Sequence, residues 1–121
     1  MQPSHRSPSP DAAALRVATE DIVRQLRGQA REQAQLIRSG AAGELVEADV
    51  ERMAADIAAA ARARLDAAVP YWQSPWADPE LQATRLEAAQ LMAAAARQMD
   101  AELRRAWRTR QEKATARWWR R

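Results

Sequence analysis

Cysteine is absent from this sequence, and histidine, lysine and tyrosine each occur once. Without thiolates the chain can form neither a disulfide framework nor a thiolate metal site. The single histidine, His5, lies in a leader rich in Ser and Pro, which argues against a histidine relay or a histidine-rich metal site. Phosphate-cradling Gly-rich loops, HExxH motifs and Ser/His/Asp sets are missing as well. The sequence therefore predicts a protein that is not an enzyme, binds no cofactor or metal, and has no small-molecule substrate.

Long apolar runs are also missing. No window approaches the eighteen uninterrupted apolar residues of a membrane-spanning helix. The first ten residues lack the apolar core of a signal peptide. We expect a soluble, cytoplasmic protein, and the abundance of Ala and Arg beside one Lys is typical of a high-GC, bacterial coding sequence.

Phenylalanine is absent, and much of the 47% hydrophobic content is alanine. The length of 121 residues fits one domain. A core of Ala with scattered Leu, Ile, Val and Met lets helices pack closely but buries little area per residue. Such a domain is modestly stable alone and gains from a partner or from self-association.

Helix-breaking residues divide the chain into a leader and three helices. Residues 1–10 hold three Ser and three Pro and are predicted to be disordered. Ser9 suits an N-cap and Pro10 the first helical position, and no residue forbids a helix from there to Arg38. The stretch 39–43 is a turn, in which Gly40 suits the left-handed cap conformation.

A second helix is predicted from about Glu44 to Ala68, and Pro70 ends it. Residues 70–79 are rich in Pro and aromatics, and we interpret them as a corner that packs over one end of the bundle rather than as a ligand pocket. The aromatic residues of this corner are Tyr71, Trp72 and Trp76. Asp78 then caps a third helix that has no Gly or Pro after Pro79.

The three predicted helices differ in length, at about 42, 37 and 60 Å for a rise of 1.5 Å per residue. Short connections make consecutive helices antiparallel, so the third runs beside the first. The predicted fold is all-α, a three-helix antiparallel bundle over residues 11–103. The long C-terminal helix projects beyond the bundle at the end that holds residues 39–43.

The projecting part is the basic segment, residues 104–121, which carries seven Arg, one Lys, three Trp and a single Glu. Its net charge is +7, against +3 for the whole chain. On a helical wheel Trp107 lies near the apolar face, where we assign it to packing, whereas Arg110 and Arg117 interrupt that face. Such a segment suits an anionic environment or an acidic groove better than a bundle core.

The interpretation we favour is a non-enzymatic nucleic-acid-binding accessory subunit of a larger (ribo)nucleoprotein assembly. Arginine pairs bidentately with phosphate, and Trp stacks on unpaired bases. The pattern matches no base-reading module, so binding to DNA or RNA is expected to be mainly electrostatic and tolerant of sequence. The predicted phosphate-binding residues are Arg104, Arg105, Arg108, Arg110, Lys113, Arg117, Arg120 and Arg121, with Trp118 and Trp119 for stacking.

Other interpretations of the basic segment remain open. Trp and Arg are common interface anchors, so the chain can also be a protein–protein adaptor or a homo-oligomeric coiled coil that docks through this segment. A membrane surface is less favoured because the polar and apolar faces are poorly segregated. A solvated, frayed end is the plainest alternative. The carboxylates near the second helix start, among them Glu47 and Glu51, are interpreted as helix-dipole partners and a solvated face.

Overall fold

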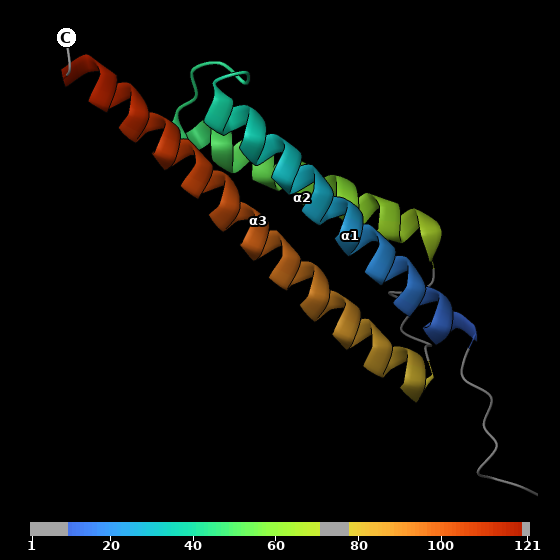
Figure 1. Cartoon of the computed structure of the whole chain (residues 1–121). Coiled ribbons are helices and arrows are strands. Elements are labelled where there is room, and N and C mark those ends of the chain that lie inside the picture. Colours follow the sequence, from blue (N-terminus) through green and yellow to red (C-terminus); the bar gives the residue numbers. More distant parts are fainter. Residues whose placement is uncertain (1–9, 71–77, 120–121) are drawn as a thin grey trace, which may run out of the picture.

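The computed structural model describes residues 10–70 and 78–119, and in these it contains three α-helices and no strand (Figure 1). The helices are α1 (Pro10–Ser39), α2 (Glu47–Ala68) and α3 (Pro79–Trp119). The predicted all-helical fold with three helices is confirmed. The predicted cap Ser9, the aromatic corner and the last two arginines lie outside the described residues.

The starts of two helices are as predicted, because local capping chemistry determines them. α1 begins at Pro10, and α3 begins at Pro79 with the Asp78 carboxylate accepting the backbone N–H of Leu81 at 2.7 Å. α2 begins at Glu47 rather than at Glu44. The carboxylate of Asp49 accepts the backbone N–H of Val46 at 3.0 Å, which fixes the first turn three residues later than predicted.

Contacts near the helix ends show how the helices run. Arg16, near the start of α1, donates to the Thr84 hydroxyl near the start of α3 at 3.4 Å. The Arg110 guanidinium of α3 lies against Gly40, just after α1 ends. α1 and α3 therefore run side by side in the same direction and share the largest contact surface, while α2 runs the opposite way (Figure 1).

The buried residues of α1 and α3 follow one common spacing. Along each helix they recur in steps of 3, 4, 4, 3, 4, 4 and 3, which is an 11-residue repeat, and each of these α1 positions has a buried counterpart 69 residues later. Only Ile22 of the buried α1 residues falls outside the series. The α1 series is Ala12, Leu15, Thr19, Val23, Leu26, Ala30, Ala34 and Ile37, and the α3 series is Leu81, Thr84, Ala88, Met92, Ala95, Met99, Leu103 and Ala106.

The two series complement each other in size. The contacts at both ends set the register, so that corresponding positions lie at the same level. Six of the eight levels then pair a larger side chain with a smaller one, as Ala34 with Leu103 or Leu26 with Ala95. This alternation fills the space between two close helices without any large aromatic, which is how an alanine-rich core can pack densely.

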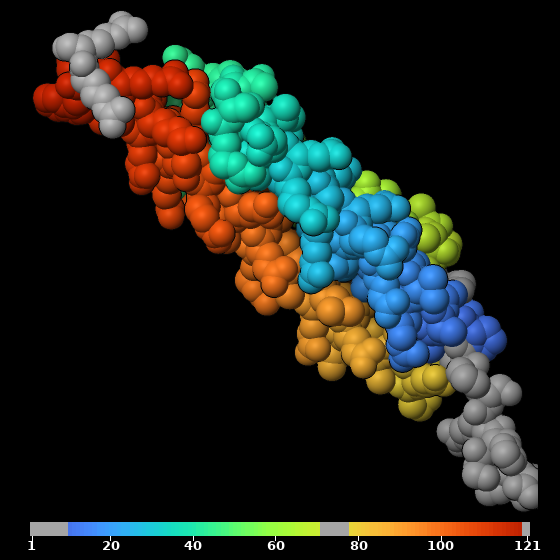
Figure 2. Space-filling view, in the orientation of Figure 1, coloured from blue at the N-terminus to red at the C-terminus, as the bar shows by residue number. Residues whose placement is uncertain are grey.

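α2 covers only one side of the α1–α3 pair. It contributes the buried residues Val50, Ala54, Ala61 and Leu65 to the core. Figure 2 views the molecule from the other side, where α1 and α3 lie next to each other with most of α2 behind them. Within residues 10–70 and 78–119, no helix has a stretch apolar and long enough to cross a bilayer.

Candidate functional site

The basic segment forms the last turns of α3, and it has two parts with different surroundings. Trp107, Arg110 and Gln111 contact the α1–α2 connection, whereas every residue from Gln111 to Trp119 is exposed. We call residues 112–119 the outer turns of α3. The division matters because only cations that are not engaged within the chain are available to a ligand.

Arg104 is engaged within the chain by three carboxylates. Its guanidinium nitrogens lie 2.8 Å from Asp100, 2.9 Å from Glu47 and 3.0 Å from Glu51. The hydrogen bond to Asp100, together with the charge of that carboxylate, raises the pKa of Arg104 above its usual value. The guanidinium is therefore cationic at any physiological pH. Glu47 and Glu51, predicted as dipole partners on a solvated face, also join the start of α2 to α3.

Trp107 joins α3 to the α1–α2 connection. Its indole N–H donates to the Leu45 carbonyl oxygen at 2.7 Å, and the Gln111 amide donates to the same oxygen at 3.4 Å. The ring packs against the core and is partly buried. The predicted packing role of Trp107 is confirmed.

Arg110 contacts the C-terminal end of α1. A Cβ built on Gly40 would lie 2.7 Å from one Arg110 nitrogen and 2.8 Å from its guanidinium carbon, so the guanidinium rests directly on the glycine. Gly40 has the predicted left-handed conformation, with a φ of 82°. Arg110 is also eleven residues after Met99, and so takes the next place in the buried series of α3. A cation suits this place because the carboxyl end of a helix carries partial negative charge.

A hollow of about 860 Å³ lies beside Arg110, between α3 and the α1–α2 connection. Its lining includes Glu44 and Glu47 as well as Arg110 and Gln111. The two carboxylates make this hollow unfavourable for phosphate, because their negative charges would repel it. An anionic ligand is therefore better placed on the outward side of α3.

Four cations of the basic segment face solvent. Within the described part of the chain, no ion pair connects any of them to a carboxylate, in contrast to Arg104. They are Arg105, Arg108, Lys113 and Arg117. Because they are distributed around α3 rather than on one stripe, they favour a ligand that wraps the helix or runs along it.

Trp118 and Trp119 complete the exposed set. Their side chains are 75% and 77% exposed. The ring centroids are 5.9 Å apart and the planes meet at 84°, so the rings touch edge to face and each keeps at least one broad face accessible. Exposed apolar faces of this size are costly in water, and they are suited to stacking on bases or to insertion in a protein interface.

The ten residues predicted for the site thus fall into three groups. Six lie exposed on α3, and Arg104 and Arg110 contact the chain itself. Arg120 and Arg121 lie outside the described residues. Sequence reasoning did not find the engagement of Arg104, because two of its partners are 53 and 57 residues away along the chain.

In the described ranges, no three His, Cys, Asp or Glu side chains are grouped so that they could hold a metal ion. Comparison with protein-family models, with curated proteins and with solved structures finds no match for this chain. We therefore infer the function of this chain from the geometry of its own residues.

Proposed function

We propose that this chain is a non-enzymatic accessory subunit that binds nucleic acid within a larger nucleoprotein assembly. It grips backbone phosphates with the exposed cations of α3 and stacks unpaired bases on the two terminal tryptophans. The phosphate contacts are assigned to Arg105, Arg108, Lys113 and Arg117. Arg120 and Arg121, which follow in the sequence, are assigned the same role. A bacterial, cytoplasmic setting stays a prediction from composition.

The observation that carries this proposal is the pair of exposed tryptophans in an environment of unpaired cations. Trp118 and Trp119 are three-quarters exposed, on outer turns whose Lys113 and Arg117 have no carboxylate partner among the described residues. A solvated helix end gains nothing from two such rings. Single-stranded nucleic acid binding uses both features, because bases stack on aromatic faces while cations follow the backbone.

The proposed architecture is an antiparallel three-helix bundle from which the outer turns of α3 project as an arm. The contacts of Trp107 and Arg110 with the α1–α2 connection support this arrangement, because they hold the base of the arm. An arm anchored at its base presents its cations in a fixed direction. This reduces the entropy lost on binding.

The rival proposal is a protein-interaction adaptor that docks through the same two tryptophans. The exposed Trp pair supports it, because Trp and Arg are frequent anchors of protein interfaces. The two proposals differ in their response to salt. Each phosphate that is neutralised releases counterions, whereas a desolvated Trp contact loses little affinity as salt rises.

The deciding experiment is fluorescence anisotropy of labelled single-stranded and double-stranded DNA and of single-stranded RNA, titrated with the full chain at two salt concentrations. For about four phosphate contacts we expect affinity for single strands to fall about 50-fold between 50 and 200 mM salt. A variant that ends at Gln111 loses binding, because it lacks the outer turns. Trp118→Ala and Trp119→Ala weaken single-strand binding by about tenfold or more.

A charge-matched pair of variants provides the control. Replacing Lys113 and Arg117 with Gln reduces the slope of log affinity against log salt by about 1.4 for single strands. Replacing the exposed Arg52 and Arg97 with Gln changes net charge equally and leaves the slope unchanged. Absence of binding at 50 mM salt, or equal effects of both pairs, would remove nucleic acid as the ligand of the arm.

A further inference from the structure

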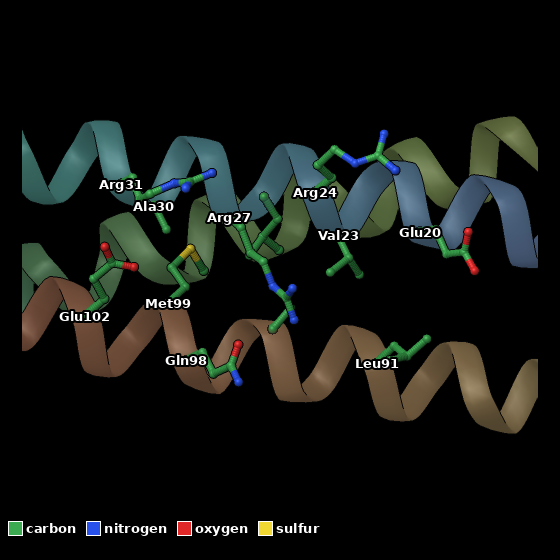
Figure 3. Close-up of a pocket in the computed structure, with 12 residues that line it drawn as sticks. Glu20, Val23, Arg24, Arg27, Ala30, Arg31, Leu91, Gln98, Met99 and Glu102 are labelled. Carbon is green, nitrogen blue, oxygen red and sulfur yellow. The ribbon is translucent and has the colours of Figure 1, made fainter.

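A groove runs along the side of the α1–α3 pair that α2 leaves open. It has a volume of about 690 Å³, and its floor includes Val23, Ala30 and Met99, with Leu91 at one edge (Figure 3). A smaller hollow between Arg16 and Leu91 continues it toward the helix starts. Leu91 is 47% exposed although it lies well inside α3. The groove thus offers an apolar strip that no part of the described chain covers.

The two rims of this groove carry opposite charge. The α3 rim carries two carboxylates, Glu87 and Glu102, and no cation. The α1 rim carries one carboxylate, Glu20, and four arginines. These arginines are Arg16, Arg24, Arg27 and Arg31. Arg16 already pairs with Glu87 across the groove at 3.9 Å, and Arg24 pairs with Asp21 of α1 at 3.7 Å. Arg27 and Arg31 on α1 and Glu102 on α3 are therefore the rim charges that a partner can meet. Figure 3 shows Arg27 reaching across the floor toward α3. A purely acidic partner would be repelled by the α3 rim, and a purely basic one by the α1 rim.

We propose that a second copy of this chain covers the groove, and that the chain is a parallel two-fold dimer. When the two-fold axis runs along the helices, α1 of each copy lies over α3 of the other, and the basic rim meets the acidic rim. A face-to-face two-fold axis across the helices would instead place α1 on α1 and set the arginines against each other. In the proposed parallel dimer, Arg31 of one copy faces Glu102 of the second copy.

The dimensions suit a stable dimer. α1 is 30 residues long, which is about 45 Å, and two packed helices present a face about 20 Å wide. Contact over that face covers about 900 Å² per copy, close to the about 800 Å² per partner of a standard interface. The alanine-rich core, which buries little area per residue, gains from this additional burial.

This contact uses none of the residues assigned to phosphate or base binding, so it stands or falls independently of the ligand of the arm. It does have a consequence for that arm. Parallel copies carry their outer turns at the same end of the dimer. Two arms then act on one ligand with a high effective concentration, without any new contact.

The test is the mass of the full chain in solution, by sedimentation equilibrium from micromolar to about 0.5 mM. We expect a mass of twice 13.5 kDa. Leu91→Lys weakens the dimer by at least about 100-fold, because it places a lysine of each copy against the arginines of the other copy's α1 rim. The matched control is Leu86→Lys on the same helix, since Leu86 is 62% exposed and does not line the groove. Circular dichroism verifies that both variants are folded.

A mass of 13.5 kDa at every concentration overturns the proposal, as does a dimer that Leu91→Lys leaves intact. A charge swap gives an independent test of the rims. Arg31→Glu and Glu102→Arg each weaken the dimer by at least about tenfold, and the double swap restores it. If none of the three variants changes the affinity of the dimer, its interface lies on another surface.

The direction of the two copies is measured with one spin label. The chain has no cysteine, so Thr115→Cys on the exposed outer turns gives a unique attachment site. Parallel copies place the two labels about 20 to 30 Å apart. Antiparallel copies would separate them by more than about 55 Å, and that distance would overturn the parallel arrangement.

Discussion

At the scale of single residues, the basic segment is a mixture of anchors and free side chains. Arg104 and Arg110 have the same charge as Arg105 and Arg108, yet the first two bind within the chain and the second two face solvent. Position on the helix decides the difference. Composition alone therefore overstates the number of cations that a ligand can use.

A pair of glycine substitutions tests the anchor at Arg110. Gly40 and Gly43 both have positive φ, so replacing either with Ala costs about 1 kcal/mol in the left-handed region. A Cβ at Gly40 also displaces the Arg110 guanidinium from the end of α1, whereas one at Gly43 meets nothing within 4 Å. We expect Gly40→Ala to lower the free energy of unfolding by about 0.5 to 1 kcal/mol more than Gly43→Ala, measured by urea denaturation.

The same comparison in an Arg110→Ala background identifies the cause. There the excess cost of Gly40→Ala should disappear, because no guanidinium is left to displace. An excess that persists would mean that the contact between Gly40 and Arg110 contributes nothing to stability.

Residue roles that depend on local geometry could be predicted from the sequence, and those that depend on a distant partner could not. The left-handed Gly40, the Asp78 cap and the packing of Trp107 follow from helix ends and helix spacing. The contact of Arg104 with Glu47 joins two helices, and nothing in the spacing of either helix indicates it. The place of Arg110 at Gly40 became visible only through the register of α1 against α3.

At the scale of the helices, the 11-residue repeat explains how α1 and α3 stay in contact over their shared length. Eleven residues make three turns at 3.67 residues per turn, close to the natural period of the α-helix. The facing positions therefore do not drift around the helix, and the pair needs no left-handed supercoil. The large-and-small pairing of levels cannot be predicted from either helix alone, because it depends on the register between them.

Exchanging the sizes at one level tests this pairing. Leu103→Ala removes a fully buried side chain and should cost about 2 to 5 kcal/mol. Ala34→Leu overfills the same level and should cost about 1 to 3 kcal/mol. The double variant restores one large and one small side chain, so we expect it to be more stable than the sum of the single costs implies by at least about 1 kcal/mol.

Urea denaturation of the four proteins gives this coupling energy. The exposed Leu86→Ala on the same helix is the control and should change stability by less than about 0.5 kcal/mol. Strictly additive costs would show that Ala34 and Leu103 do not share a level.

At the scale of the whole molecule, α3 serves both as a wall of the bundle and as the carrier of the exposed set. The boundary predicted at Leu103 lies where charge begins to accumulate in the sequence. Beyond it, Arg104, Trp107 and Gln111 still bind the rest of the chain.

Two truncations test this boundary. A chain that ends at Gln111 keeps every anchor, so its thermal midpoint should stay within about 2 °C of the full chain. A chain that ends at Leu103 loses the packed Trp107, worth about 2 kcal/mol or more, and should unfold about 10 °C or more lower. Thermal unfolding followed by circular dichroism measures both. Equal midpoints for the two truncations would place the boundary at Leu103.

The register of α1 and α3 also restricts how the length of such a chain can change. Inserting one residue into α1 turns every later side chain by about 100°, which separates the facing series. Eleven residues added to each helix preserve every level and lengthen the body by about 16 Å. Among related chains we therefore expect the body to vary in whole units of three turns, while the outer turns of α3, which face no second helix, vary one residue at a time.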